Sequence, residues 1–248
     1  MLQARRRQVR LLAALVLAVA AYFAGSRAEA QATVDLQLVL AVDTSGSVSN
    51  ERFILQQQGY VAAFRSPRLL AAILSGTTRS VAVTMTQWTG PAQHLQVVPW
   101  TLITDEASMR GFAEAIDRTP RQLFGGGTSI SGAIDHAMAL LGDSTFVGSR
   151  RVIDVSGDGA NNRGRPSGEA RDDAVRAGVV INGLPILALE PYLDDYYREH
   201  VIGGAGSFVI VTKSYGDFAE AVLMKLILEI SADGTAGQAF DIASAAPP

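Results

Sequence analysis

The sequence predicts an α/β fold: an open, mostly parallel sheet with one antiparallel edge strand and helices on both faces. Three observations predict it. Short apolar runs alternate with longer amphipathic segments along most of the chain, one pair of runs is joined by a link too short to hold a helix, and 48% of the 248 residues are apolar. Alternating strands and helices favour a parallel sheet because right-handed crossovers place helices on both of its faces.

The first half of the chain predicts a strand at 34–42, a helix at 50–74, strands at 79–88 and 94–100, and helices at 105–118 and 129–141. Ser49 or Asn50 suits the N-cap of the first helix and Thr104 that of the second. Alternating residues from Val81 to Met85 favour the second strand. The Gly90-Pro91 break leaves no room for a crossover, so the strand at 94–100 should pair antiparallel at the edge.

The second half continues the alternation, with strands at 151–156, 179–189 and 207–211 and helices at 167–177, 194–202 and 215–230. The domain should therefore span about residues 34–230. Residues 231–248 are rich in Ala, Gly, Ser and Pro, which predicts a flexible C-terminal tail.

The first thirty residues have the pattern of a secretory signal peptide. Four arginines between Arg5 and Arg10 precede an apolar run at 11–24, and Ala28-Glu29-Ala30 offers a small-x-small cleavage site. The run is shorter than the roughly twenty residues that a membrane-spanning helix needs. We therefore expect export and a periplasmic or secreted protein without a stable membrane span. An uncleaved anchor and a loosely matching twin-arginine signal remain as alternatives.

Net charge and cysteine content exclude several classes of binding partner and metal site. Without residues 1–30 the chain loses five arginines and Glu29, which leaves 16 basic and 23 acidic side chains and a formal net charge of −7. Binding to nucleic acid or anionic lipid needs clustered Lys and Arg, so this balance argues against both. The chain has no cysteine, which excludes disulfides and thiolate metal sites.

Hard oxygen donors gather directly after the first predicted strand, in the pentapeptide Asp43-Thr44-Ser45-Gly46-Ser47. Magnesium and calcium prefer such oxygen ligands. In open α/β sheets, ligands bind beyond the carboxyl ends of the strands, where the strand order reverses. Thr128 follows Gly125-Gly126-Gly127 before a helix, and Asp158 follows the strand at 151–156 between two glycines.

The order Asp-x-Ser-x-Ser, then Thr in a glycine-rich loop, then Asp after a strand resembles the metal-ion-dependent adhesion site of the von Willebrand factor type A (vWA) superfamily. All five positions match: Asp43, Ser45, Ser47, Thr128 and Asp158. The predicted element order is also similar to the Rossmann-like vWA fold over about residues 34–230. Phrases such as Trp88-Thr89-Gly90 and the segment 152–159 resemble an uncharacterised, exported bacterial branch of the superfamily.

The resemblance implies a metal site formed by these five residues, with Mg²⁺ as the expected ion and Mn²⁺ or Ca²⁺ as options. The hydroxyls would coordinate directly, and Asp43 and Asp158 would balance the charge directly or through water. Family members capture an Asp or Glu of a protein or peptide partner at the open coordination position. The resemblance therefore implies a binding module and not an enzyme.

Other interpretations stay open. Each of the three segments alone is also typical of an ordinary turn or helix cap. The alternative is a magnesium-dependent hydrolase or phosphoryl-transfer enzyme that uses the same site, although the three loops contain no Lys or His that could act as a general acid or base. A bound ion could also serve structure alone.

Several neighbouring residues are predicted to have secondary roles. Asp154, inside a strand, should be buried and hydrogen-bonded. Trp88 and Trp100 should pack on the sheet. Asn161 and Asn162 would either orient water or a partner, or lie in a solvated loop. The acidic, aromatic segment 192–199 would be a partner surface or a solvated helix face.

Overall fold

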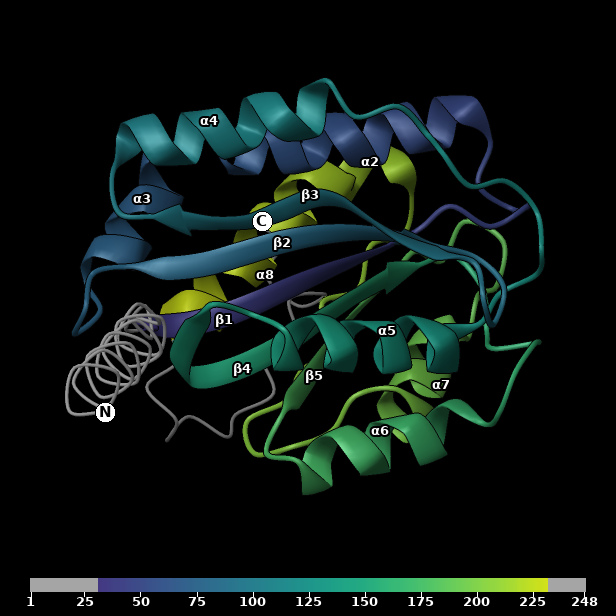
Figure 1. Cartoon of the computed structure of the whole chain (residues 1–248). Coiled ribbons are helices and arrows are strands. Elements are labelled where there is room, and N and C mark those ends of the chain that lie inside the picture. The colour runs from purple at the N-terminus through teal and green to yellow at the C-terminus, as the bar shows by residue number, and fades with distance from the viewer. Residues whose placement is uncertain (1–30, 232–248) are drawn as a thin grey trace, which may run out of the picture. The chain divides into compact units, whose positions relative to one another are not determined.

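The computed structural model describes residues 31–231, and the predicted signal peptide and residues 232–248 lie outside this range. A five-stranded sheet in the order β3-β2-β1-β4-β5 forms its centre (Figure 1). The strands are β1 (Ala32–Asp43), β2 (Val81–Trp88), β3 (His94–Ile103), β4 (Phe146–Gly157) and β5 (Val180–Pro185). β1 pairs parallel with β2 and β4, and β4 pairs parallel with β5. β3 pairs antiparallel with β2 at the edge, which confirms the predicted fold class.

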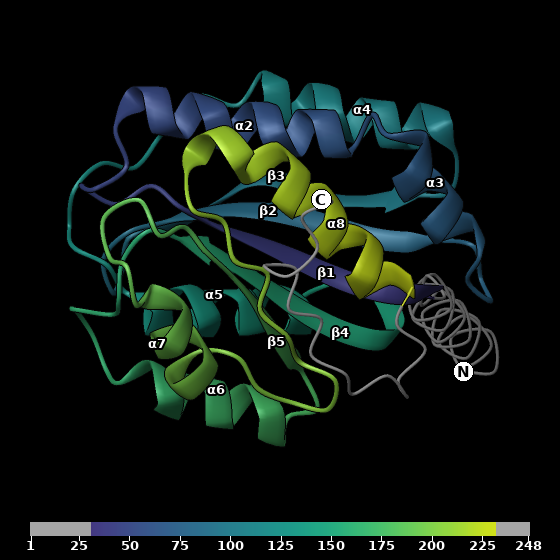
Figure 2. The same ribbon diagram turned by 180° about the vertical axis from the view of Figure 1, so that it is seen from behind.

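Helices cover both faces of the sheet (Figure 2). One face carries α2 (Asn50–Ala63), α3 (Pro67–Leu74), α4 (Glu106–Asp117) and α8 (Phe218–Ser231). The other carries α5 (Ile130–Gly142), α6 (Ser167–Arg176) and α7 (Leu193–His200). Within residues 31–231, none of the helices combines the length and apolar character needed to span a bilayer.

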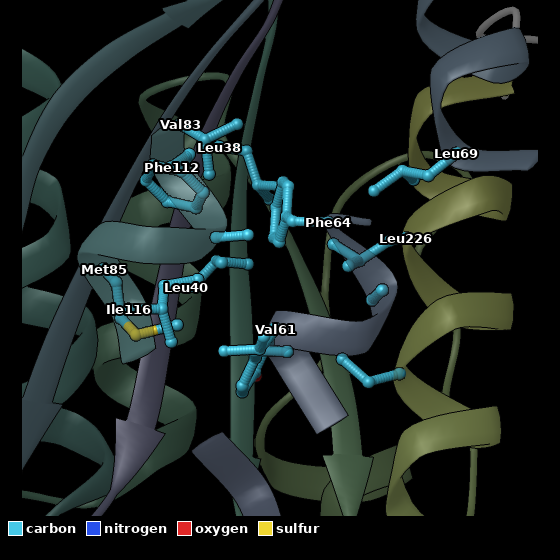
Figure 3. Packing of buried hydrophobic residues seen from close by; sticks show 14 of the residues in the cluster. Leu38, Leu40, Val61, Phe64, Leu69, Val83, Met85, Phe112, Ile116 and Leu226 are labelled. Carbon is cyan, nitrogen blue, oxygen red and sulfur yellow. The ribbon is translucent and has the colours of Figure 1, made fainter. Parts of the chain in front are cut away.

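Alternation along β1 divides the core into two hydrophobic clusters, because successive strand residues point to opposite faces. Leu36, Leu38 and Leu40 belong to the cluster under α2, α3, α4 and α8, whereas Val39 and Ala41 belong to the cluster under α5, α6 and α7. Figure 3 shows how the first cluster interlocks side chains from β1, β2 and these four helices. β1 is buried on both faces, which positions its carboxyl end firmly.

The predicted single helix at 50–74 is wrong, because the chain forms two helices with a turn between them. Pro67 has no N–H to continue a helical ladder, and it occupies the first turn of α3. Ser66 caps this new helix by accepting a hydrogen bond from the backbone N–H of Arg68. Likewise, Asp105 rather than Thr104 caps α4, through a reciprocal pair of hydrogen bonds with Ser108.

The predicted strand at 207–211 is also wrong. This segment contacts β5 only through isolated bridges, such as that from Val209 to Gly183. Gly204 and Gly206 just before it have positive φ angles of 92° and 76°, which turn the chain away from an extended path. β5 ends at Pro185, so it is shorter than the predicted 179–189. The last helix begins with a 3₁₀ turn, η1 (Tyr215–Asp217), before α8.

The carboxyl ends of β1 and β4 lie side by side, with Val42 opposite Ser156 in the parallel register. From β1 the chain crosses to β2 and β3 on one side and then returns to β4 on the other. The strand order therefore reverses between β1 and β4. This is the position where open α/β sheets bind ligands, and Asp43 and Asp158 meet there.

Candidate functional site

Asp43 is the last residue of β1, and it is completely buried. Its Oδ1 accepts a hydrogen bond from the backbone N–H of Ser45 (2.7 Å), which turns the chain sharply after the strand. Its carbonyl accepts a bond from the amide of Gln56 on α2 (3.2 Å). Its Oδ2, however, has no hydrogen-bond partner.

Gly157 makes room for that free oxygen. A Cβ at this position would lie 2.9 Å from Asp43 Oδ2 and 3.0 Å from the Tyr197 hydroxyl, which is also buried without a partner. Only glycine lets β4 approach the Asp43 side chain so closely. The result is a small polar space between the ends of β1 and β4.

The two serines connect this loop to Asp158. Ser45 Oγ lies 3.0 Å from Ser47 Oγ, and Ser47 Oγ donates to Asp158 Oδ1 at 2.5 Å. Ser45 and Asp158 are each 1% exposed, while Ser47 is half-buried. Four of the five predicted site residues therefore form one cluster of oxygen atoms at adjacent strand ends.

Thr128, the fifth predicted residue, lies close to Gly159, the residue after Asp158. Its Oγ1 is 3.6 Å from the position that a Cβ on Gly159 would take. The backbone of Ser129 donates to the Thr89 carbonyl (2.7 Å), which ties the start of α5 to the end of β2. Gly125, Gly126 and Gly127 all have positive φ angles, and this run bends the chain back toward the Asp43 loop.

Asn162 holds the Thr128 loop in place. Its Oδ1 accepts from the backbone N–H of Thr128 (2.9 Å), and its own backbone N–H donates to the Thr128 carbonyl (2.9 Å). Asn161 accepts from the backbone N–H of Ser131 in the same way (3.1 Å). Both asparagines thus position the Thr128 loop, and Asn162 is exposed in a loop, as one of the two alternatives from the sequence proposed.

Three side chains that sequence reasoning missed complete the site. Arg52 on α2 lies 3.3 Å from Asp158 Oδ2, and the Tyr215 hydroxyl donates to the same oxygen at 2.8 Å. Arg121 donates to the carbonyls of Thr44 and Ser45 (2.8 and 3.0 Å). Nothing in the local sequence pattern marks these residues, because tertiary packing alone brings them to the strand ends.

Burial dominates the electrostatics of Asp43. Loss of hydration raises the pKa of its carboxyl from 3.8 to about 7; the Ser45 backbone hydrogen bond partly opposes this, and the nearby Asp158 adds to it. Burial and Asp158 likewise raise the pKa of the Tyr215 hydroxyl. The Asp43 carboxyl is therefore costly to ionise unless a cation lies beside it.

The donors fit a hard divalent cation. Two carboxylates and three hydroxyls supply oxygen atoms only, and one buried carboxylate oxygen is left without a partner. Within residues 31–231, no group of three or more His, Cys, Asp or Glu side chains could hold a metal ion. A cation site here must therefore depend on its hydroxyls.

Two other predicted residues lie in the core. Asp154 is fully buried, as predicted, and forms an ion pair with Lys225 of α8, but neither of its carboxylate oxygens accepts the predicted hydrogen bond. Trp88 is fully buried, and Trp100 packs against the same hydrophobic cluster while its indole N–H donates to the Leu140 carbonyl (3.1 Å).

Solved structures with a similar fold contain vWA domains. The chain matches proximal thread matrix protein 1 from the mussel byssus with a TM-score of 0.56 and 13% identity, over 82% of this chain and 47% of that one. It matches a von Willebrand factor type A protein from Catenulispora acidiphila with a TM-score of 0.54 and 16% identity, over 79% of this chain and 43% of that one. It matches the pilus adhesin SpaC from Lactobacillus rhamnosus GG with a TM-score of 0.56 and 16% identity, over 80% of this chain and 30% of that one. The chain thus spans less than half the length of each.

A second structure of the mussel protein, described as having a zinc-occupied MIDAS motif, aligns with a TM-score of 0.53 at 14% identity, over 78% of this chain and 46% of that one. At these identities the matches show the fold alone. No curated protein matches the sequence.

The sequence profile of one family, described as "Protein of unknown function (DUF1194)", matches residues 33–234. This range includes all five predicted site residues and, apart from Ala32 at the start of β1, all five strands. The chain is therefore a member of the DUF1194 family, and its fold is that of a vWA domain.

Proposed function

We propose that the protein is an exported, metal-dependent binding module that captures an acidic residue of a protein or peptide. The observation that carries this proposal is the unpartnered Oδ2 of the fully buried Asp43, beside a cluster of serine hydroxyls and Asp158. A buried carboxylate oxygen without a donor is costly, and a divalent cation would satisfy it. Mg²⁺ is the ion we expect, with Mn²⁺ or Ca²⁺ as alternatives.

Asp43, Ser45, Ser47, Thr128 and Asp158 would hold the ion. When bound, the cation would supply a Lewis-acidic position open to an anionic oxygen from outside. Asn162 and the Gly125–Gly127 run position Thr128, while Tyr215 fixes Asp158 by donating to its Oδ2. Site residues are thus already oriented by hydrogen bonds before any ligand arrives, which lowers the ordering cost of binding.

Exposed apolar side chains suggest what else the partner presents. Among the described residues, the three most exposed large apolar side chains are Tyr192 (79%), Phe124 (61%) and Leu189 (52%). Phe124 precedes the glycine run, and the Arg121 guanidinium lies 4.7 Å from its ring centre. Leu189 and Tyr192 flank Glu190, whose carboxylate accepts from the backbone N–H of Ala160 beside the site (3.1 Å).

These three side chains, which we call the apolar rim, lie in loops at the carboxyl edge of the sheet. Exposed aromatic side chains are enriched at binding interfaces. We therefore infer that the captured carboxylate is followed or preceded by an apolar side chain in the partner.

Calorimetry tests the metal site. Wild-type protein should bind Mg²⁺ or Mn²⁺, whereas Asp43→Ala and Asp158→Ala should not. Asp117→Ala is the matched control because Asp117 is exposed at the end of α4, and it should bind like wild type. Cation binding that persists in both site variants would refute the site.

Selection from a displayed peptide library tests the partner. Peptides retained with Mg²⁺ and eluted by a chelator should be enriched in Asp or Glu next to apolar residues. The double variant Phe124→Ser, Tyr192→Ser should keep calorimetric metal binding and lose most of this retention. Enrichment without acidic residues would contradict the proposed capture.

The enzyme alternative is tested with the same proteins. If wild-type protein hydrolyses generic phosphate or carboxylate esters with Mg²⁺ and Asp43→Ala does not, the proposed binding function is wrong and the protein is a hydrolase. We expect no such turnover, because Arg52 and Arg121 are both occupied by partners and no histidine lies in the three site loops.

A further inference from the structure

A cluster of charged side chains lies deep between β4 and α8, away from the solvent. Asp154 of β4 and Lys225 of α8 are fully buried, and Glu229, one turn further along α8, is 1% exposed. Lys225 Nζ lies 2.6 Å from Asp154 Oδ1 and donates a very short hydrogen bond to Glu229 Oε1. A primary amine and two carboxyl groups are therefore in direct contact inside the core.

The surroundings of this cluster isolate it from water. Asn182 donates to Glu229 Oε1 (3.1 Å) and accepts from the backbone N–H of Phe208 (3.0 Å). The Phe208 ring centre lies 5.6 Å from Lys225 Nζ. Neither oxygen of Asp154 accepts a well-oriented hydrogen bond, and Glu229 Oε2 has no partner. The ion pair is thus poorly satisfied for a fully buried one.

The charges of the cluster do not balance. One lysine faces two carboxyl groups, so a proton must be shared for the cluster to be neutral. Burial raises the pKa of Glu229 to about 7, and it raises the pKa of Asp154 against the opposing effect of Lys225. Burial thus favours the neutral form of both carboxyl groups, the form that a nucleophile can attack or that can return a proton.

We propose that Lys225 and Asp154 condense into an intramolecular amide bond, with Glu229 as the proton carrier. Glu229, as a carboxylic acid, gives its proton to the Asp154 carboxylate and takes one from the Lys225 ammonium, and the free amine attacks Asp154 Cγ. The C–N bond forms, Glu229 gives that proton to the departing hydroxyl and takes the second proton from the nitrogen, the C–O bond breaks, and water leaves. Overall, ammonium and carboxylate become amide and water, Glu229 ends as it began, and no oxidant is needed.

Contact and burial favour this condensation over the reverse hydrolysis. Fixed geometry gives such pairs effective concentrations on the order of 10⁵ M or more. A neutral amide also removes the cost of keeping two ions in the core. The product would join the centre of the sheet to the last helix, a cross-link that a chain without cysteine cannot obtain from a disulfide.

Mass spectrometry of the folded full chain tests the bond. Wild-type protein should be lighter than its sequence mass by one water molecule. Trypsin cannot cleave after a modified Lys225, so the peptide 152–163 should remain joined to the peptide 214–248. Lys225→Met should abolish this joined peptide.

Two conservative variants separate chemistry from folding. Asp154→Asn should release ammonia instead of water, and its mass should converge on that of wild type because the product is the same. Glu229→Gln keeps a hydrogen-bonding side chain but cannot carry the proton, so it should stay at its full sequence mass. Circular dichroism shows whether each variant is folded. A folded wild-type chain at its full sequence mass, without the joined peptide, would overturn the proposal.

Discussion

Asp43→Asn should stabilise the metal-free protein while abolishing its response to Mg²⁺. The amide keeps an oxygen to accept the hydrogen bond from the Ser45 backbone N–H. It replaces the unpartnered Oδ2 by an NH₂ group close to the Tyr197 hydroxyl, since both atoms lie about 3 Å from the position of a Gly157 Cβ. The substitution thus removes the charge and preserves the shape.

The magnitude follows from the pKa of Asp43. A rise from 3.8 to about 7 corresponds to about 4 kcal/mol of lost stability once the native carboxyl ionises. The folded state holds the proton more tightly than the unfolded chain, so this loss is absent below about pH 4, grows between pH 4 and 7, and is complete above pH 7. An incompletely paired amide costs about 1–2 kcal/mol, which leaves a net gain of about 2 kcal/mol for the variant near pH 8.

Urea unfolding in a chelator, at pH 5 and pH 8, measures this difference. The gain of Asp43→Asn over wild type should be larger at pH 8 than at pH 5. The same substitution at the exposed Asp117 should change little at either pH. Adding Mg²⁺ should raise the unfolding free energy of wild type and not of Asp43→Asn. A variant that is no more stable than wild type at pH 8 would refute the conclusion that the ionised Asp43 carboxylate destabilises the metal-free protein.

Two further substitutions probe the site from β4 and α2. Gly157→Ala would place a Cβ 2.9 Å from Asp43 Oδ2, so it should lower the unfolding free energy by about 1–3 kcal/mol and weaken metal binding in calorimetry. Gly111→Ala on α4 is the control, because a Cβ there meets nothing within 4 Å, and it should be neutral or stabilising. Equal changes in unfolding free energy for Gly157→Ala and Gly111→Ala would contradict the close approach of β4 to Asp43. Arg52→Ala removes a cation 3.3 Å from Asp158 Oδ2, so it should tighten Mg²⁺ binding several-fold, about 1 kcal/mol for a partly exposed pair. Arg118→Ala is the exposed control and should leave Mg²⁺ affinity unchanged. If Arg52→Ala also leaves Mg²⁺ affinity unchanged or weakens it, Arg52 does not compete with the ion.

The sequence predicts well which strands carry the site, because the hydrophobic pattern of each strand and the lengths of the links between strands are local properties of the chain. Apolar runs that alternate with amphipathic segments, and the short link before β3, were enough to predict the sheet. The parallel register then places Val42 opposite Ser156, so that Asp43 lies at the carboxyl end of β4. The errors arose where a single residue overrides a pattern. Pro67 splits an otherwise continuous helix, and Pro185 with the glycines at 204 and 206 limits the last strands.

Partners from distant segments could not be predicted in this way. The sequence indicates that Asp154 is buried, since it lies inside an apolar strand, but Lys225 is 71 residues away on another element. Arg52, Arg121 and Tyr215 reach Asp158 or the Asp43 loop from α2, the segment after α4 and η1. No short-range pattern in the chain relates them, and only the packed fold brings them together.

One face of β4 connects the candidate metal site to the last helix. Side chains two residues apart on a strand share a face. On β4, Asp154 contacts Lys225 of α8, and Ser156 lies 3.2 Å from the Tyr60 hydroxyl of α2. Asp158, just after the strand ends, accepts a hydrogen bond from Tyr215 of η1 in the same layer of helices. Tyr215 and Lys225 lie ten residues apart on the continuous η1–α8 segment. Any movement of that segment would disturb Asp158. Tyr215, at the start of this segment, orients the Asp158 carboxylate, and Lys225 further along it contacts Asp154. An amide bond between Lys225 and Asp154 would therefore anchor the η1–α8 segment to β4. The buried cluster would in this way support the candidate metal site as well as the core.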